Sequence, residues 1–156
     1  MVRRVITGNS VDGNSYLVSD DEVAGMTLWE SSPGDPLGSA NGAPHAVLPT
    51  TAPGLEPPPG GSRCVFATIP PWAIMRPNLE RGDYPGLDAD GFHRTETVDY
   101  IMMVSGEITL VLDQGETTVR AGDLVVQRNT MHSWRNNGHG PASFWATMVS
   151  VKPTAP

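Results

Sequence analysis

The sequence is poor in cysteine, in positive charge and in long hydrophobic runs. Its single cysteine, Cys64, cannot form an internal disulfide, so nothing indicates an oxidising compartment. No stretch approaches the roughly 18 consecutive apolar residues that a membrane span needs. Arg3 and Arg4 lie near the start but are not followed by the apolar segment of a secretory signal. We therefore predict a cytoplasmic protein without membrane contact.

Charge and composition further restrict the fold class and the kinds of partner. Acidic residues outnumber Lys and Arg, and the formal net charge is −7, which makes nucleic acid an unsuitable partner. The 156 residues are enough for one domain with its own core. No long helical stripe of apolar residues is present, and the 17 Gly and 15 Pro suit a loop-rich all-β protein.

Short runs typical of β-strands recur along the chain, separated by turn residues. We predict strands at 2–7, 15–19, 23–29, 63–69, 92–95, 97–104, 107–112, 116–120, 124–128, 131–135 and 143–151, with a turn at 20–21, a short extended piece at 72–75 and a polar loop at 77–90. Residues 31–62 are too rich in Pro and Gly for a central strand. They could wrap the surface, carry a short strand at 45–48 or join a partner subunit. These runs predict one domain, 1–156, with an N-terminal part (1–62) and a barrel core (63–152).

Two segments contain the residues that carry chemistry. In the first, His93, Thr95 and Asp99 precede Gly106; in the second, a Gly-Asp pair at 122–123 is followed by His132 and, four positions later, by Asn136. Together they resemble the two motifs of the cupin superfamily, which are His-x-His…Glu…Gly and Gly-Asp…Pro-x-Gly…His…Asn. The resemblance implies an all-β, cupin-type jelly-roll β-barrel, also called a double-stranded β-helix. Thr95 stands where that family has its second His, Asp99 stands where it has Glu, and residues 127–129 replace Pro-x-Gly.

The same residues predict a metal site inside the barrel. On an unbroken strand, residues 93, 95, 97 and 99 share one face, and the resemblance brings His132 in from another strand. Two imidazoles and one carboxylate suit one divalent transition metal: Fe, Mn, Ni or Zn. We predict His93, Asp99 and His132 as ligands. The alternatives are a pair of hydrogen-bonded histidines without metal, and an Asp99 that only orients an imidazole.

Other residues are candidates for contact with a substrate. A threonine hydroxyl is a poor metal ligand, so Thr95 is predicted to bind the substrate or a metal-bound water. Tyr100 and Trp134 are predicted to act at the pocket as well, although either could be core. Arg128 and Arg135 flank His132 and could bind a carboxylate, or could form ion pairs with Asp123 or Glu107.

The resemblance implies a small-molecule tailoring enzyme with a metal site in the barrel. It would be an oxidoreductase or a lyase, such as a dehydratase or decarboxylase, acting on an oxygenated organic substrate. The alternative is a metal-free barrel that binds a small molecule without catalysis. Because exposed sheet edges need cover, and because cupins of this size commonly pair, we also predict a homodimer in which residues before Ser62 pack across the two-fold axis.

Overall fold

A computed structural model describes residues 1–33 and 54–152, and most of them lie in β-strands. The elements in chain order are β1 (Val2–Asn9), β2 (Ser15–Val23), β3 (Thr27–Ser31), β4 (Ser62–Ile69), α1 (Trp72–Glu80), β5 (Thr97–Ser105), β6 (Glu107–Leu112), β7 (Gly115–Arg120), β8 (Leu124–Arg128), β9 (His132–Arg135) and β10 (Ala142–Ser150). No helix in these two ranges is long and apolar enough to cross a lipid bilayer.

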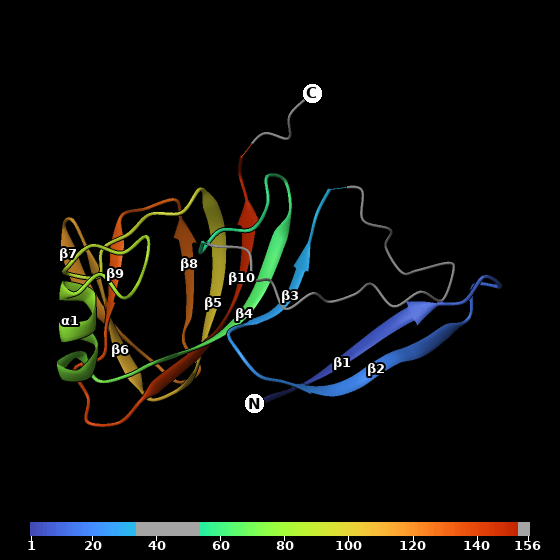
Figure 1. Cartoon of the computed structure of the whole chain (residues 1–156), viewed down its shortest axis with the longest axis horizontal. Coiled ribbons are helices and arrows are strands. Elements are labelled where there is room, and N and C mark those ends of the chain that lie inside the picture. The colour runs from blue at the N-terminus through green and yellow to red at the C-terminus, as the bar shows by residue number, and fades with distance from the viewer. Residues whose placement is uncertain (34–53, 153–156) are drawn as a thin grey trace.

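Two antiparallel sheets enclose the core. One has the strand order β3-β4-β10-β5-β8 and the other the order β7-β6-β9, with α1 beside the smaller sheet (Figure 1). Strand alternation explains the layering: on β5, Ile101 and Met103 point inward and are almost fully buried, whereas Tyr100 and Met102 point outward. The all-β jelly-roll fold predicted from the sequence is confirmed.

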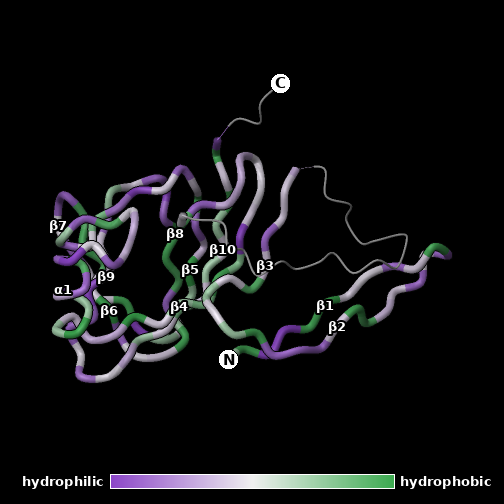
Figure 2. Tube along the Cα trace, viewed as in Figure 1, coloured by the Kyte–Doolittle hydropathy of each residue, from purple (hydrophilic) through white to green (hydrophobic). Residues whose placement is uncertain are grey.

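The core fills the space between the two sheets. It is made of aliphatic and aromatic residues from both: Val65, Ala67, Ile101, Met103, Ile108, Leu110, Val119, Trp134, Ala142, Phe144 and Ala146. Figure 2 shows a hydrophobic stretch along β8, while many of the connecting loops are hydrophilic. The packing of β10 between β4 and β5 places this strand at the centre of the larger sheet.

The first two strands form a hairpin that projects from the barrel (Figure 1). Within the described residues, β1 and β2 pair only with each other. The sequence prediction of a turn at 20–21 was wrong, because cross-strand ion pairs keep these aspartates in β2: Arg3 bonds Asp20 at 2.7 Å and Arg4 bonds Asp21 at 2.6 Å. A hydrogen bond from the Arg4 guanidinium to the Leu28 carbonyl ties the base of the hairpin to β3.

Three other local predictions differ from the structure. Residues 72–75 begin helix α1, because Met75 and Leu79 form one buried face that outweighs the helix-breaking tendency of Pro77. Residues 92–95 form no strand, and only His93 makes an isolated bridge. The predicted strand at 23–29 is replaced by β3, which begins at Thr27. The predicted strand at 45–48 falls outside the described residues.

Candidate functional site

Two histidines far apart in the sequence lie against each other inside the barrel. The backbone of His93 bonds that of His132 in both directions, at 2.9 and 3.0 Å. Residues paired in this way present their side chains on the same side of the ladder. The two imidazole centroids are accordingly 4.2 Å apart, with an angle of 51° between the ring planes. A short two-residue bridge therefore assembles the pair.

The hydrogen-bond partners of the two rings differ, and they fix the tautomer of His93. Nδ1 of His132 lies 2.9 Å from the Thr130 carbonyl, and Nδ1 of His93 lies 3.2 Å from the Gly91 carbonyl. The Gly91 carbonyl only accepts, so Nδ1 of His93 donates and its Nε2 keeps a free lone pair, whereas Nδ1 of His132 lies between the Thr130 carbonyl and the amide nitrogen of Gln127. Burial lowers the pKa of His93, and burial together with repulsion from His93 lowers the pKa of His132 to about 4. Both rings are neutral at neutral pH.

A strip of hydroxyl groups leads from this pair to a carboxyl group. Thr95, Thr97 and Asp99 are all less than 6% exposed, as the alternation from position 95 to 99 predicted. The Thr95 and Thr97 hydroxyls are 2.7 Å apart. Burial raises the pKa of Asp99, and a hydrogen bond from Thr97 partly offsets that rise. Because Thr97 donates to Asp99, Thr95 donates to Thr97, and the lone pairs of the Thr95 oxygen stay free for a ligand.

Gln127 belongs to the same polar cluster, although the sequence reasoning did not identify it. It pairs with Asp99 across β5 and β8, and its amide contacts Nδ1 of His132. The sequence could have identified Gln127, since alternation along β8 turns Val125 and Gln127 toward the inside of the barrel. Within the described residues, Asp99 Oδ1 and Gln127 Oε1 have no hydrogen-bond partner. Two buried acceptors without donors favour a ligand that brings hydroxyl groups.

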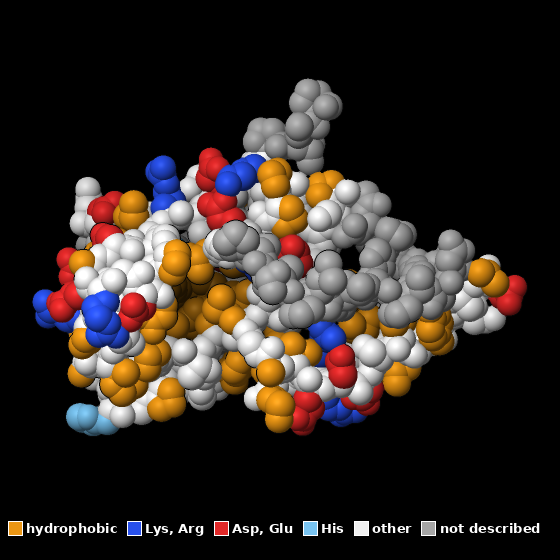
Figure 3. All heavy atoms as spheres, in the orientation of Figure 1, with side chains coloured by type: hydrophobic (Ala, Val, Ile, Leu, Met, Phe, Trp, Pro, Cys, Tyr) orange, Lys and Arg blue, Asp and Glu red, His pale blue; other side chains and the backbone are white. Residues whose placement is uncertain are grey.

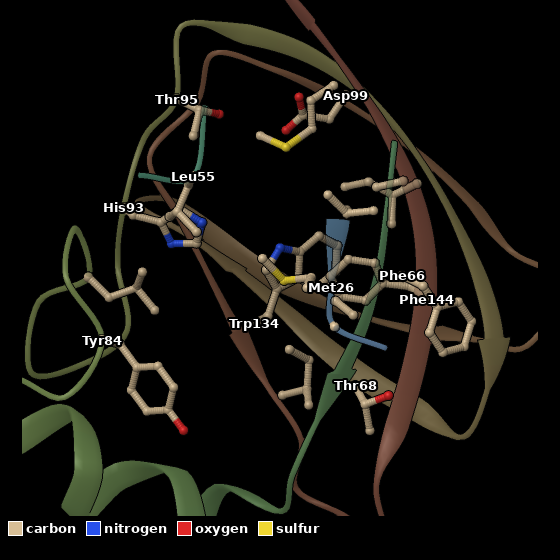
Figure 4. Close-up of a pocket in the computed structure, with 18 of the residues that line it drawn as sticks. Met26, Leu55, Phe66, Thr68, Tyr84, His93, Thr95, Asp99, Trp134 and Phe144 are labelled. Atoms are coloured by element: carbon tan, nitrogen blue, oxygen red, sulfur yellow. The ribbon is translucent and has the colours of Figure 1, made fainter. Parts of the chain in front are cut away.

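The polar cluster forms one end of a pocket of about 720 Å³. Its other walls are mostly apolar and include Met26, Phe66 and Phe144 (Figure 4). The space-filling view shows a hollow lined by hydrophobic side chains between the two sheets (Figure 3). No Lys or Arg is among the described residues that line the pocket. A neutral, largely apolar molecule with a hydroxylated end fits such a chamber.

Of the other predicted site residues, some line the pocket in the structure and others do not. Trp134 lines the pocket, with its ring 5.9 Å from that of His132. Tyr100 does not line it: β5 turns this side chain to the outer face of the sheet, where it is 46% exposed, and its predicted catalytic role is corrected. Arg135 packs over the rings of Trp72 and Phe92, at 5.1 and 5.7 Å, and so cannot serve as a carboxylate receptor in the pocket.

The predicted metal ligands are of suitable types but are not assembled as a ligand set. Within the described part of the chain, no three His, Cys, Asp or Glu side chains come close enough to hold an ion. Two imidazoles meet, while Asp99 lies farther along β5 beyond Thr95 and Thr97. A resident transition metal usually takes three protein ligands. The two imidazoles alone therefore do not complete the ligand set of a resident metal.

A strap of three residues, Gly54–Glu56, borders the polar end of the pocket. Leu55 lines the pocket together with His93 and Thr95 (Figure 4). Glu56 accepts a hydrogen bond from the Glu96 backbone at 2.9 Å and pairs with Lys152, the chain's single lysine. Lys152 also lies 3.2 Å from the Glu96 carboxylate. The strap is thus fastened by polar contacts at the rim.

We expect Lys152→Ala to open this rim. Without its ammonium group the Glu56 side chain loses its ion pair, so the strap should shield the imidazoles less. Diethyl pyrocarbonate, which modifies neutral imidazoles, should then react several-fold faster with His93 and His132, as followed by mass spectrometry of their peptides. The exposed His139 serves as internal control, and Arg120→Ala, which breaks an exposed pair with Glu107, is the matched variant. Unchanged rates at His93 and His132 would contradict shielding by the strap.

The buried imidazole of His132 should make the protein less stable in mild acid. Its pKa is about 4 when folded and near 6.5 when unfolded, so the unfolded state binds more protons between these values. The contribution of neutral His132 to the free energy of unfolding is present above pH 6.5 and is lost as the pH falls toward 4. Over that window the loss amounts to about 3 kcal/mol. Urea unfolding at about pH 7 and about pH 4.5 should show most of this loss in the natural chain and a smaller one in His132→Gln.

Comparisons with known proteins identify relatives of this chain. The cupin domain model matches residues 83–151. The chain is 32% identical to phomopsin biosynthesis cluster protein C' of Diaporthe leptostromiformis, over 86% of this chain and 75% of that protein. It is 45% identical to the cupin-domain-containing oxidoreductase srdD of Neurospora crassa, over 44% of this chain and 36% of that protein.

Similarity to solved structures is more distant. The plu4264 protein of Photorhabdus luminescens superposes with a TM-score of 0.44 and 15% identity, over 67% of this chain and 72% of that one. Among the sequence relatives, several alignments cover only about a third of the relative's length, whereas the phomopsin cluster protein is matched along most of both chains. On the strength of that long match and the cupin domain model, the chain belongs to the cupin family.

Proposed function

We propose that the protein is a tailoring enzyme of small-molecule biosynthesis that removes water from a neutral β-hydroxy carbonyl compound. The observation that carries the proposal is the pair of neutral imidazoles, His132 buried and His93 partly buried, at the polar end of an otherwise apolar pocket. The names of its relatives, biosynthesis cluster proteins and cupin-domain-containing oxidoreductases, support a tailoring role. The sequence left an oxidoreductase, a dehydratase and a decarboxylase open, and of these we propose the dehydratase.

The chemistry needs only groups of this chain. Nε2 of one imidazole takes a proton from the carbon beside the substrate carbonyl, and the electron pair of that C–H bond forms the C=C bond. The C–O bond of the hydroxyl breaks, and the departing oxygen takes a proton from the imidazole pair, leaving as water with both rings neutral again. Because the two rings repel each other's charge, the pair holds one proton at a time.

The remaining polar groups orient the substrate. The free lone pairs of the Thr95 oxygen and the unpartnered Asp99 Oδ1 accept hydrogen bonds from substrate hydroxyls. The described residues of the pocket wall include no Lys or Arg that could neutralise a carboxylate, which argues against a decarboxylase. Trp134 and Phe144 supply flat apolar surface for the substrate body.

The test is dehydration of a panel of neutral aryl- and alkyl-substituted β-hydroxy ketones, followed by the absorbance of the conjugated enone. We expect turnover that survives treatment with a chelator, because no step requires a metal. The absence of enone formation across the panel would reject the proposal.

A metal-dependent oxidoreductase is the second candidate. The observation that favours it is that Nε2 of His93 is free and that both Nδ1 atoms lie near backbone carbonyls, an arrangement common in metal-binding histidines. Close to one Fe, Mn, Ni or Zn per purified chain, lost when both histidines are replaced by alanine, would support this candidate over the dehydratase.

A further inference from the structure

Gln127 lies behind the imidazole pair, and the proposed reaction does not yet use it. Its side chain is 4% exposed and does not line the pocket, so it acts on a ligand only through its neighbours. It stands where the cupin motif has the proline of Pro-x-Gly, a residue whose side chain has no donor or acceptor. A buried amide needs partners for both its oxygen and its NH2 group. The fold places His132 and Asp99 beside it.

Nδ1 of His132 has two partners, and only one orientation of the Gln127 amide suits both. The Thr130 carbonyl, 2.9 Å away, can only accept, so it requires a proton on Nδ1. With that proton in place, the second partner must also be an acceptor, whereas the structure turns the amide nitrogen of Gln127 toward Nδ1. A half-turn about the last side-chain bond exchanges the amide nitrogen and oxygen without changing the shape of the side chain, and it brings Oε1 to Nδ1.

The same half-turn gives donors to the two buried acceptors that lack one. Oε1 of Gln127, which has no partner among the described residues, then accepts from the Nδ1–H group of His132. Asp99 pairs with Gln127 across β5 and β8, and residues paired in this way have Cβ atoms about 4.5–5.5 Å apart. The NH2 group that leaves His132 is therefore the donor that the strand register offers to Asp99 Oδ1. A carboxyl oxygen has a second lone pair, so a substrate hydroxyl can bind Asp99 as well.

We propose that Gln127 is a positioning residue for the dehydration: its amide oxygen accepts from Nδ1–H of His132 and its NH2 group donates to Asp99. The effect on the rate rests on the proposed function, and the hydrogen bonds do not. Held in this way, His132 keeps its proton on Nδ1 and its lone pair on Nε2, as His93 does through the Gly91 carbonyl. Hydrogen bonds in a chain polarise one another, so the carboxyl group behind the amide makes the imidazole a better proton acceptor.

The tautomer of His132 tests the hydrogen bonds directly. In the 15N-labelled chain at neutral pH, the imidazole NMR spectrum should show His132 protonated on Nδ1 and not on Nε2, with the signals assigned by their loss in His132→Gln. Gln127→Met keeps the length of the side chain but removes both polar groups. The Nδ1 proton should then be less strongly hydrogen-bonded, so its signal should move upfield and exchange faster with water. A proton on Nε2 of His132 in the natural chain would overturn the proposal, as would an Nδ1 signal that Gln127→Met leaves unchanged.

The matched control is the chain's other glutamine. Gln114 is exposed in the turn between β6 and β7, so Gln114→Met makes the same chemical change away from the pocket. It should leave the imidazole spectrum and the dehydration rate as they are in the natural chain. Far-ultraviolet circular dichroism checks that each variant is folded.

Kinetics test the effect on the reaction. Gln127→Met should lower kcat for dehydration about 10–100-fold, the usual loss when the outer partner of a working imidazole is removed. KM should change little, because Gln127 does not line the pocket. Gln127→Glu keeps an oxygen toward Nδ1 and should recover much of the loss. A natural kcat in Gln127→Met, or a Gln127→Glu variant as slow as Gln127→Met, would remove Gln127 from the positioning role.

The two proposals fail in different experiments. If no ketone of the panel is dehydrated, the proposed function is rejected, while the tautomer of His132 and the response of its Nδ1 proton to Gln127→Met still decide whether Gln127 holds the ring. If enone forms but the proton of His132 lies on Nε2, the dehydratase stands and the role of Gln127 is rejected.

Discussion

Replacing His93 or His132 by glutamine is expected to lower the dehydration rate by about 10²–10⁴-fold, the usual contribution of a positioned acid or base. Glutamine keeps a polar side chain of similar length but cannot accept and return a proton. Because the two rings act as one unit, the dehydration rate of the double variant should be only slightly lower than that of the less active single variant. Initial rates of enone formation under saturating substrate measure the effect.

The control for this experiment lies within the same chain. His139 is exposed in a loop between two glycines and does not line the pocket, so His139→Gln should keep the natural rate. Thr95→Val should mainly raise KM, since it removes an acceptor for the substrate hydroxyl and leaves both imidazoles in place. Full activity in either His93→Gln or His132→Gln would remove that histidine from the reaction.

Replacing Arg63 by methionine should lower the free energy of unfolding by about 3–5 kcal/mol, as removal of one partner of a buried ion pair does. Arg63 is 3% exposed; its guanidinium lies 2.5 Å from the Glu30 carboxylate and donates to the Gly54 carbonyl at 2.9 Å. The substitution leaves the mostly buried Glu30 without its cation and frees one end of the Gly54–Glu56 strap. Urea unfolding at neutral pH measures the loss.

Two further variants separate the ion pair from simple packing. Arg76→Ala breaks the exposed pair with Glu80 on α1 and should cost about 0.5 kcal/mol or less. Glu30→Leu combined with Arg63→Met replaces both charges by apolar groups and should recover much of the stability. A double variant as unstable as the sum of its two single variants would show that the stability does not come from charge pairing.

Strand boundaries in the barrel followed from local pattern. The ranges 107–112 and 124–128 were predicted as the structure has them, because alternating apolar residues and glycine-containing turns coincide there. The aspartates of β2 were misplaced in a turn, because the arginines that hold them lie on another strand. Helix α1 was missed because Pro77 outweighed the spacing of Met75 and Leu79. Tertiary contacts decided both cases.

The sequence predicted which residues line the candidate site better than it predicted how far apart their side chains lie. The motif spacing identified His93, Thr95, Asp99 and His132, and all four line one pocket. Placing positions 95, 97 and 99 on the inner face already placed Tyr100 on the outer one, so that error was avoidable. The separation of Asp99 from the imidazoles depends on where β5 begins and on the His93–His132 bridge, and neither is encoded in ligand spacing.

The central position of β10 constrains the order in which the barrel can fold. This strand comes after all the other strands in the chain, yet it lies between β4 and β5 and hydrogen-bonds to both. During synthesis, β4 and β5 leave the ribosome before β10 does. Until β10 is made, the strand edges of β4 and β5 that will pair with it are unpaired and prone to aggregation. Most of the pairings that close the sheet join distant residues, which predicts slow folding for a chain of this size. Chaperone dependence during translation, followed by high resistance to unfolding once β10 has inserted, is the expected behaviour in the cell.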